Sequence, residues 1–200
     1  GKRFDFHPFR GVELRDKVLG VLGTGKIGSE VVRIGRGFGM KIVAFDMYPN
    51  EALAREHAFS YRPLDEVLRA SDFVSVHLPL TDDTRGLIGK EALQKMKKDS
   101  ILINAARGPI VDEDALREAL NSGHLRAAGV DVIADESDPG SSPLIDSERA
   151  IITPHIGFFT AEAVERMLDH SIDIIRSFRS GTVTGRVPVE YVSASAARSG

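Results

Sequence analysis

The sequence predicts an α/β protein with a doubly wound parallel sheet in three layers, α/β/α. Short apolar runs alternate with segments of helical periodicity along the 200 residues, which is the order expected of βαβ units. The apolar runs are continuous rather than alternating, as in strands that are buried on both faces. A glycine-rich turn follows the first run. We therefore expect helices on both faces of one sheet and a binding site at the carboxyl ends of its strands.

Six apolar runs are predicted as strands, because each is short and is bounded by turn residues. They are residues 18–22, 41–45, 73–76, 101–103, 129–132 and 151–153. Helices are predicted at residues 27–38, 51–56, 64–70, 90–96, from 112 to 120, and at 161–178. Asp112 is expected to cap the fifth helix and Gly123 to end it. We expect residues 1–190 to form one domain and residues 191–200, which are small and polar, to form a flexible tail.

The composition is that of an ordinary globular protein, with 42% hydrophobic residues, 28% charged residues and a net charge of −3. No excess of positive charge would attract nucleic acid or an anionic membrane. No apolar stretch approaches the roughly 20 residues needed to span a bilayer. Cys is absent, which excludes disulfides and thiol chemistry and fits a reducing compartment. We expect a cytoplasmic protein that binds small molecules, and neither nucleic acid nor membrane.

Three glycines in GTGKIG, Gly23, Gly25 and Gly28, follow the first predicted strand directly. In a dinucleotide-binding turn, Gly23 would permit the tight turn and Gly25 would let the backbone approach a pyrophosphate. Gly28 would let the next helix pack closely on the strand. Free N–H groups and the helix dipole would then face the anion. The motif alone also occurs in nucleotide-free turns, but its place between a strand and a helix favours a Rossmann-type site.

Asp46 follows the second predicted strand and lies 18 residues after Gly28. This is close to the separation expected for the carboxylate that binds the ribose 2′-hydroxyl of a dinucleotide. A carboxylate at that point would repel a 2′-phosphate, so the sequence predicts NAD rather than NADP. The alternative is that Asp46 is an ordinary surface charge.

A second group of polar residues follows the later strands and includes Arg107, Asp131, Glu136 and His155. The planar guanidinium of Arg107 suits a carboxylate or a keto acid. A histidine with a carboxylate partner, such as His155 with Glu136, can act as a general acid. From position alone, Arg107 could equally cap a helix, Glu136 could be a solvated loop acid, and His155 could be structural.

His77 follows the strand predicted at residues 73–76 and could line a cofactor cleft. No pair of histidine and acidic residues has the helical spacing of a metal site, so no metal is predicted.

Five motifs occur in order and together resemble the D-isomer-specific 2-hydroxyacid dehydrogenases over residues 11–190. They are VLGTGKIG with Asp46, SDFVSVHLPLTDDTRGLI at 71–88, MKKDSILINAARGPIVDEDAL at 96–116, GVDVIADE at 129–136 and ITPHIG at 152–157. The motif at 96–116 is the most specific of these. The alternative of an α/β domain with decayed function is disfavoured by Asp46 and by the complete glycine set.

The resemblance implies a catalytic trio. Arg107 would bind the substrate carboxylate and polarise the carbonyl, and His155 would protonate the carbonyl oxygen as NADH delivers hydride. Glu136 would hold the imidazole and favour its protonated form, so reduction of a keto acid should fall as His155 loses its proton at rising pH. The resemblance also implies cofactor contacts from Lys26, Ile27, His77, Leu78, Pro79, Thr84, Ala105, Ala106, Arg107, Asp131, His155 and Gly157.

Smaller features resemble the D-lactate dehydrogenase branch rather than glyoxylate, glycerate, phosphoglycerate or phosphite relatives. They are the run 158–160, Ser137 after Glu136, and AFDMYPN at 44–50. The family usually dimerises through its cofactor domain, and the apolar residues Phe4, Phe6 and Phe9 have no obvious partner within the chain, so we expect a homodimer. These aromatic residues could equally pack on the edge of the sheet. A different function is also open. Transcriptional corepressors resemble the family too, so the chain could be a non-enzymatic NAD-sensing interaction module.

The sequence departs from the family pattern in length. Members are usually longer and begin with a separate substrate domain, to which the chain returns at its end. Here only residues 187–191 suggest that return. Because catalysis needs a closed, water-poor cleft and an oriented substrate, we expect cofactor binding with weak or absent turnover unless the missing domain is supplied.

Overall fold

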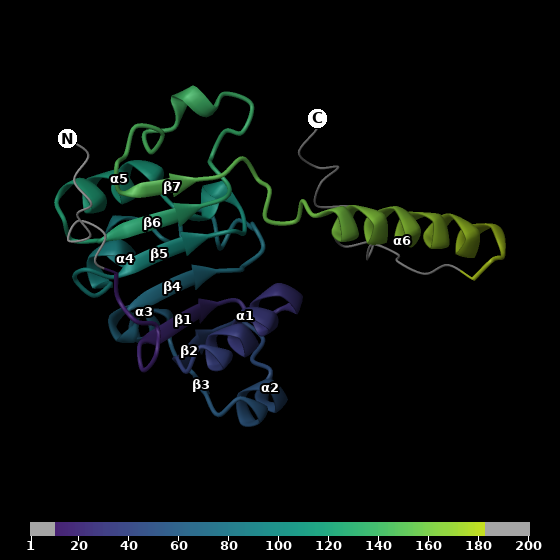
Figure 1. The fold of residues 1–200 in the computed structure, drawn as a ribbon, viewed down its shortest axis with the longest axis horizontal. Coiled ribbons are helices and arrows are strands. Elements are labelled where there is room, and N and C mark those ends of the chain that lie inside the picture. Colours follow the sequence, from purple (N-terminus) through teal and green to yellow (C-terminus); the bar gives the residue numbers. More distant parts are fainter. Residues whose placement is uncertain (1–10, 183–200) are drawn as a thin grey trace, which may run out of the picture. The chain divides into compact units, whose positions relative to one another are not determined.

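The computed structural model of the chain describes residues 11–182 and confirms the predicted α/β fold (Figure 1). Seven strands form one parallel sheet in the order β3-β2-β1-β4-β5-β6-β7. The strands are β1 (Val18–Leu22), β2 (Lys41–Phe45), β3 (Ser60–Tyr61), β4 (Phe73–Val76), β5 (Ile101–Asn104), β6 (Ala127–Val130) and β7 (Ala150–Ile152). The order of the strands reverses between β1 and β4, which is the switch point of a doubly wound sheet.

Six α-helices lie between or after these strands. They are α1 (Lys26–Gly37), α2 (Glu51–Glu56), α3 (Leu64–Ala70), α4 (Lys90–Lys95), α5 (Glu113–Asn121) and α6 (Ala161–Arg179). Asp112 caps α5 as predicted, because its Oδ1 accepts a hydrogen bond from the backbone N–H of Ala115 at 3.0 Å. Gly123 follows α5 with a φ of +71°, the left-handed conformation that favours glycine after a helix.

Right-handed crossovers distribute the helices over two faces of the sheet. The chain moves along the sheet in one direction from β1 through α1 to β2, and in the opposite direction from β3 through α3 to β4. Therefore α1 and α3 lie on opposite faces. The crossovers through α4 and α5 run in the same direction as the one through α3, so these three helices share a face. In agreement, α3 contacts α4, α4 contacts α5, and α1 contacts β1 and β2 (Figure 1).

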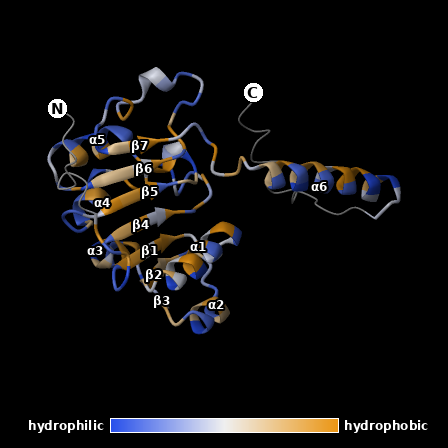
Figure 2. Cartoon of the chain, viewed as in Figure 1, coloured by the Kyte–Doolittle hydropathy of each residue, from blue (hydrophilic) through white to orange (hydrophobic). Residues whose placement is uncertain are grey.

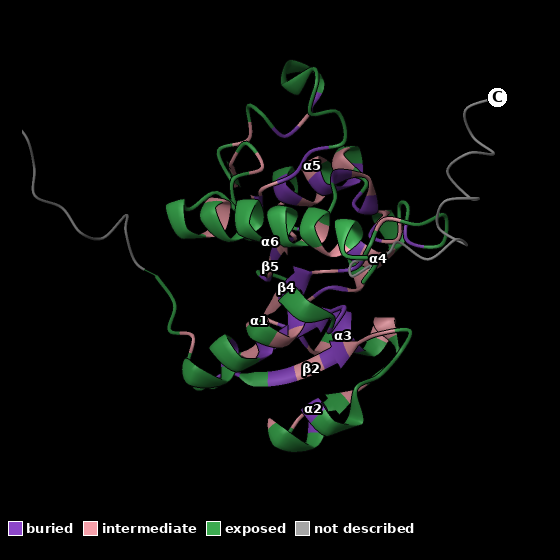
Figure 3. Cartoon of the chain, turned by 90° about the vertical axis from the view of Figure 1, so that its right-hand side faces the viewer, coloured by how far each residue is buried: buried purple, intermediate pink, exposed green. Residues whose placement is uncertain are grey.

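The apolar strand residues supply the core of this sheet (Figure 2). A large cluster joins β4, β5 and β6 to α3, α4 and α5, and includes the fully buried Leu68, Leu102 and Leu116. A smaller cluster joins β1 and β2 to α1, and includes Val21 and Val32. Burial is concentrated in the strands and in the sheet-facing sides of the helices (Figure 3). The core thus fixes the strands while their carboxyl ends stay accessible.

The parallel hydrogen bonding continues one residue beyond several strands. The N–H of Gly23 donates to the carbonyl of Phe45 at 2.8 Å, and the N–H of His77 donates to the carbonyl of Leu22 at 2.7 Å. The N–H of Asp131 donates to the last carbonyl of β5 at 2.9 Å. Residues that follow different strands are therefore held at one edge of the sheet.

Several sequence-based boundaries are wrong by one or two residues. The fifth and sixth predicted strands are shifted, because β6 is Ala127–Val130 rather than 129–132 and β7 is Ala150–Ile152 rather than 151–153. The ladder explains the shift: Val130 pairs with the last residue of β5, and the chain leaves the sheet after it. The two-residue strand β3 was not predicted at all, because so short a run has no periodicity.

The chain divides into two compact units, Gly1–His155 and Ile156–Gly200. The sheet and α1 to α5 belong to the first unit, and α6 belongs to the second. The division predicted at residue 190 stays a prediction. The predictions for Phe4, Phe6 and Phe9, for residues 187–191 and for the tail at 191–200 fall outside the described residues. Across residues 11–182, none of the helices combines the length and apolarity that a membrane span requires.

Gly28 gives a test of how this fold is packed. A Cβ at Gly28 would lie only 1.9 Å from the carbonyl oxygen of Gly23, a backbone atom that cannot move aside easily. We expect Gly28→Ala to lower the free energy of unfolding by roughly 2 kcal/mol or more, and the melting temperature by about 4–8 °C.

The matched control is Gly37→Ala in the same helix. A Cβ at Gly37 meets nothing within 4 Å, so this substitution should leave the melting temperature unchanged or raise it slightly. Equal melting temperatures for the two variants in a thermal scan would contradict the packing described here.

Candidate functional site

The glycine turn between β1 and α1 has the geometry of an anion site. Gly23 has a φ of +90°, and a Cβ there would lie 2.9 Å from the carbonyl group of His77. Gly25 is the N-cap residue of α1; no side chain caps the helix, and a Cβ at Gly25 would meet nothing within 4 Å. Lys26 and Ile27 open the first turn. The open space above Gly25 and the uncapped helix terminus fit a pyrophosphate group.

Asp46 lies beside this turn, as the sequence predicts. Its Oδ2 accepts hydrogen bonds from the backbone N–H of Thr24 at 2.6 Å and from the Thr24 hydroxyl at 2.9 Å. Its Oδ1 accepts one from the backbone N–H of Tyr48 at 2.9 Å. The end of β2 and the glycine turn after β1 are therefore joined through one carboxylate.

A pocket of about 430 Å³ opens between the ends of β1, β4 and β5. It is lined by Ile27, His77, Leu78, Pro79, Leu80, Ala105, Ala106 and Arg107. All of these except Leu80 are predicted cofactor contacts. Ile27 is 66% exposed, so a bound ligand would cover an apolar side chain that water now contacts.

Thr84 supports this wall and does not line it. Its hydroxyl donates to the carbonyl of Pro79 at 2.6 Å and accepts from the N–H of Thr81 at 2.8 Å. The side chain is buried beneath the loop. It therefore fixes the path of Leu78 and Pro79 along the pocket.

His77 lines the same pocket. Its Nε2 is paired with the hydroxyl of Ser75 at 2.8 Å, and its Nδ1 is buried with no hydrogen-bond partner among residues 11–182. Burial lowers the pKa of His77 to about 4, from an ordinary value of 6.5. His77 is therefore neutral at pH 7.

Arg107 is presented by a loop that Asn104 holds from below. The Asn104 side chain is buried, donates to the carbonyl of Arg107 at 3.0 Å and accepts from the N–H of Ala106 at 3.1 Å. A Cβ at Gly108 would lie 2.0 Å from the carbonyl oxygen of Ile133, so the loop touches the backbone that follows β6. The Arg107 residue is exposed and lines the pocket.

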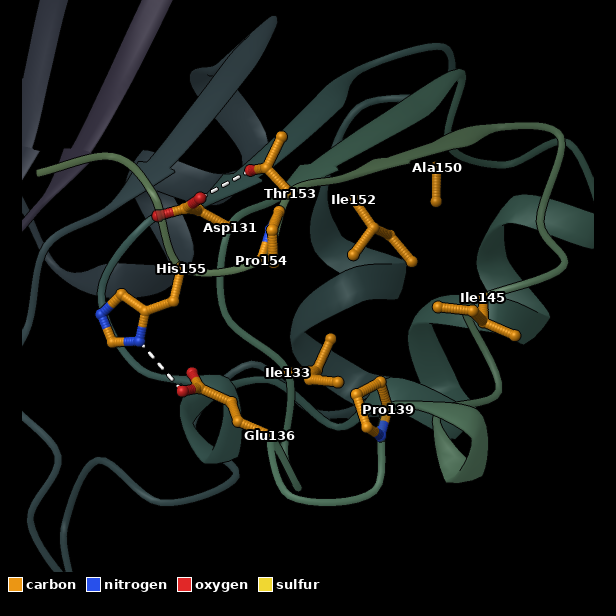
Figure 4. Close-up of a pocket in the computed structure, with 10 residues that line it drawn as sticks. All are labelled: Asp131, Ile133, Glu136, Pro139, Ile145, Ala150, Ile152, Thr153, Pro154 and His155. Atoms are coloured by element: carbon orange, nitrogen blue, oxygen red, sulfur yellow. Dashed lines mark hydrogen bonds and ion pairs between the residues drawn. The ribbon is translucent and has the colours of Figure 1, made fainter. Parts of the chain in front are cut away.

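Glu136 and His155 are brought together although 19 positions separate them. Oε2 of Glu136 lies 3.0 Å from Nδ1 of His155 (Figure 4). His155 has a φ of +53°, which is uncommon for a residue with a side chain. Its N–H is fixed in this conformation by the carbonyls of Asp131 at 2.8 Å and Thr153 at 3.0 Å. The backbone thus turns the imidazole toward Glu136.

Asp131 shares a second pocket with this pair, of about 490 Å³ (Figure 4). Thr153 donates its hydroxyl proton to Oδ1 of Asp131 at 2.6 Å. The bond turns the carboxylate of Asp131 toward β7, while Glu136 takes the Nδ1 side of the imidazole. Apolar residues line the rest of the pocket, among them Ile133, Pro139, Ile145, Ala150 and Ile152.

The predicted trio is therefore distributed over two pockets. Glu136 and His155 line one, and Arg107 lines the other. Gly157 belongs to the second unit of the chain, which begins at Ile156. Within residues 11–182, no three or more His, Cys, Asp or Glu side chains cluster in a way that could hold a metal ion.

Sequence reasoning missed four supporting residues, Thr24, Tyr61, Asn104 and Thr153. Three of them lie within the quoted motifs: Thr24 follows Gly23, Asn104 precedes Ala105, and Thr153 lies two positions before His155. Their closeness in sequence to a predicted site residue was the available signal. Tyr61 lies on β3 and carried no signal in the sequence.

His77 gives a test of the pocket through pH. Its pKa is about 4 in the folded chain and near 6.5 when unfolded, so the unfolded state binds more protons between these values. The stability that neutral His77 contributes is complete above about pH 6.5. It is lost as the pH falls toward 4. We expect the urea concentration at the midpoint of unfolding to fall as the pH is lowered from about 6.5 to 4. It should fall less for His77→Gln.

The matched control is His170→Gln, because His170 is exposed on α6. This variant should keep the full pH dependence of the original chain. If His77→Gln also kept it, the burial of the imidazole would not be the cause.

Curated relatives match this chain over part of their own length. The chain is 40% identical over 171 residues to a hydroxypyruvate reductase of Blautia hydrogenotrophica, covering 86% of this chain and 53% of the relative. It is 42% identical over 183 residues to a glyoxylate reductase of Aeropyrum pernix, covering 90% of this chain and 55% of the relative. The chain thus spans about half the length of these two relatives.

Solved structures and a family model agree with this similarity. The D-lactate dehydrogenase of Aquifex aeolicus, solved with NAD and lactic acid, superposes with a TM-score of 0.78 at 35% identity, over 88% of this chain and 57% of that one. Residues 2–157 match the family described as "D-isomer specific 2-hydroxyacid dehydrogenase, NAD binding domain". The chain therefore belongs to the D-isomer-specific 2-hydroxyacid dehydrogenases, and its sheet is the NAD-binding domain of that family.

Proposed function

We propose that this chain acts in the NAD-dependent interconversion of D-2-hydroxy acids and 2-keto acids by hydride transfer. The observation that carries the proposal is the contact of 3.0 Å between His155 and Glu136. It lies at the carboxyl edge of the same sheet that carries the glycine turn and Asp46. A dinucleotide turn alone would serve many functions, whereas a histidine oriented by a carboxylate at that edge supports proton transfer.

The cofactor site in this proposal runs along the carboxyl edge of the sheet. The N-terminus of α1 and Gly25 would face the pyrophosphate. The carboxylate of Asp46 would accept a hydrogen bond from a hydroxyl of the adenosine ribose. The pocket lined by Ile27 and Ala105 would hold the part of the cofactor between the pyrophosphate and the nicotinamide. Bound NADH supplies the hydride.

His155 would exchange the proton that accompanies the hydride. Because Nδ1 faces Glu136, we assign the exchange with the substrate oxygen to Nε2, the other ring nitrogen. In the reductive direction the protonated ring would donate its proton to the carbonyl oxygen of the substrate. In the oxidative direction the neutral ring would accept the proton.

Arg107 would bind the carboxylate of the substrate. Its guanidinium is exposed, planar and able to make two parallel hydrogen bonds to a carboxylate. The buried amide of Asn104 and the close approach at Gly108 fix the backbone from which it projects.

The substrate is proposed as a small 2-keto acid, with pyruvate first. Similar proteins are named for hydroxypyruvate, glyoxylate and lactate, which share a carboxylate beside the reacting carbon. The names of these relatives, reductases and a dehydrogenase, favour an enzyme over the interaction module. We also propose a homodimer in the cytoplasm, where the absence of Cys from the sequence fits a reducing environment.

Cofactor binding can be tested at Gly25, where an added Cβ meets no other protein atom within 4 Å. We expect Gly25→Ala to leave the melting temperature unchanged and to weaken NADH binding by roughly tenfold or more, because a methyl group there would meet the pyrophosphate. Calorimetric titration with NADH measures the change. Unaltered affinity in a folded Gly25→Ala sample would remove the glycine turn from the cofactor site.

Catalysis can be tested by NADH oxidation with pyruvate, hydroxypyruvate and glyoxylate. His155→Ala should lower turnover by a factor on the order of 100 or more, because it removes the proton donor. Glu136→Gln should lower it less, since an amide can still contact the ring. Because reduction consumes a proton, the rate of reduction should fall as the pH rises.

Two outcomes would count against these roles: full turnover in His155→Ala, or a reduction rate that is flat from acid to alkaline pH. If the folded chain binds NADH without any turnover, the proposal narrows to cofactor binding, and the chemistry requires a domain or partner beyond these residues.

A further inference from the structure

Asp46 is the end of a hydrogen-bonded series that reaches the edge of the sheet. Its Oδ2 accepts the hydroxyl proton of Thr24 at 2.9 Å. The hydroxyl of Thr24 lies 2.8 Å from that of Tyr61, and the Tyr61 oxygen accepts the backbone N–H of Asn50 at 3.1 Å. Three side chains from the glycine turn, β2 and β3 are thereby connected.

The direction of each bond is determined by the two ends of the series. A carboxylate only accepts, so Thr24 must use its single hydroxyl proton on Asp46. The remaining contact of the Thr24 oxygen must then be filled by a proton from Tyr61. A backbone N–H only donates, so the Tyr61 oxygen accepts from Asn50. Because all the bonds run toward Asp46, each one polarises the next and strengthens the donor that reaches the carboxylate.

Tyr61 is itself held firmly. It lies on β3, where it pairs with Ala44 of β2, two positions before Asp46. Its ring contacts that of Phe59 edge to face, with centroids 5.2 Å apart, and packs on the smaller core cluster. The hydroxyl of Tyr61 therefore has a fixed position relative to the end of β2.

The same series determines which part of the carboxylate can meet a ligand. Thr24 supplies two donors to Oδ2, and Tyr48 supplies one to Oδ1. A carboxylate has about four acceptor positions. Counting the described residues, one position is left, and it is on Oδ1.

We propose that Tyr61, acting through Thr24, is a positioning residue that holds Asp46 with Oδ1 toward the adenosine ribose and so sets the preference of this chain for NAD over NADP. The inference rests on the proposed role of Asp46 in ribose binding. A carboxylate fixed in this way accepts one ribose hydroxyl and keeps its charge where a 2′-phosphate would lie. A carboxylate free to rotate does neither well.

The test compares the affinities of Tyr61→Phe for NADH and NADPH, measured by titration of cofactor fluorescence. The sequence has no Trp, so protein emission interferes little with this signal. We expect NADH to bind roughly three- to tenfold more weakly, as for loss of one hydrogen bond. NADPH binding should weaken less. The dissociation constant for NADPH divided by that for NADH, which measures the preference for NADH, should therefore fall. Tyr48→Phe is the matched control, because the Tyr48 ring is 87% exposed and only its backbone contacts Asp46.

A double-mutant cycle separates positioning from general damage. If Tyr61 acts through Asp46, Tyr61→Phe should have no further effect on NADH affinity once Asp46→Ala is present. Thr24→Ser keeps the hydroxyl and should keep the preference for NADH over NADPH. Thr24→Val removes the hydroxyl and should lower this preference, as Tyr61→Phe does.

The outcomes distinguish failure of this inference from failure of the proposed ribose site. If Asp46→Ala left the NADH-to-NADPH ratio unchanged, the ribose role of Asp46 would be wrong. The other case is that Asp46→Ala abolishes the preference for NADH, whereas Tyr61→Phe leaves it intact because it weakens the binding of neither cofactor or of both equally. The ribose role of Asp46 would then stand, and the positioning role of Tyr61 would be overturned.

Discussion

The parallel pairing of the seven strands is the constraint on which the site depends. In a parallel sheet all the carboxyl ends lie along one edge, and here the ladder holds the first residue after several strands in register. Gly23, Asp46, His77 and Asp131 each follow a different strand directly. These four residues need no loop to position them, because each directly follows a strand that the ladder holds in place. This part of the site is therefore fixed by the strands of the core although it lies at the surface.

Close backbone contacts add to this precision at two points. Gly28 against Gly23 and Gly108 against Ile133 bring backbones nearer than any side chain would allow. Each contact joins elements that carry different parts of the site: the first packs α1 on the turn after β1, and the second sets the Arg107 loop against the segment after β6. The positive φ of His155 is sustained in a similar way, by two backbone hydrogen bonds.

Most of the fold was predictable because parallel strands are apolar throughout and helices between them have a regular period. The short strand β3 was not, since two residues carry no pattern. The boundaries of β6 depended on pairing with β5, which is a property of the partner strand. In the site, the residue types at strand ends indicated Asp46, Arg107, Glu136 and His155. Their supports could not be predicted, because the hydroxyls of Thr24 and Thr153 matter only through partners that are distant in the sequence.

The connection of β3 to Asp46 has a consequence for local unfolding. A two-residue edge strand with one neighbour is among the parts of a sheet that open first. Opening of β3 would withdraw Tyr61 from Thr24 and loosen the carboxylate at the end of β2. Conversely, a ligand that binds only when the carboxylate is fixed stabilises the closed form of β3. Binding at the ribose position should therefore increase the protection of the β3 amides from hydrogen exchange.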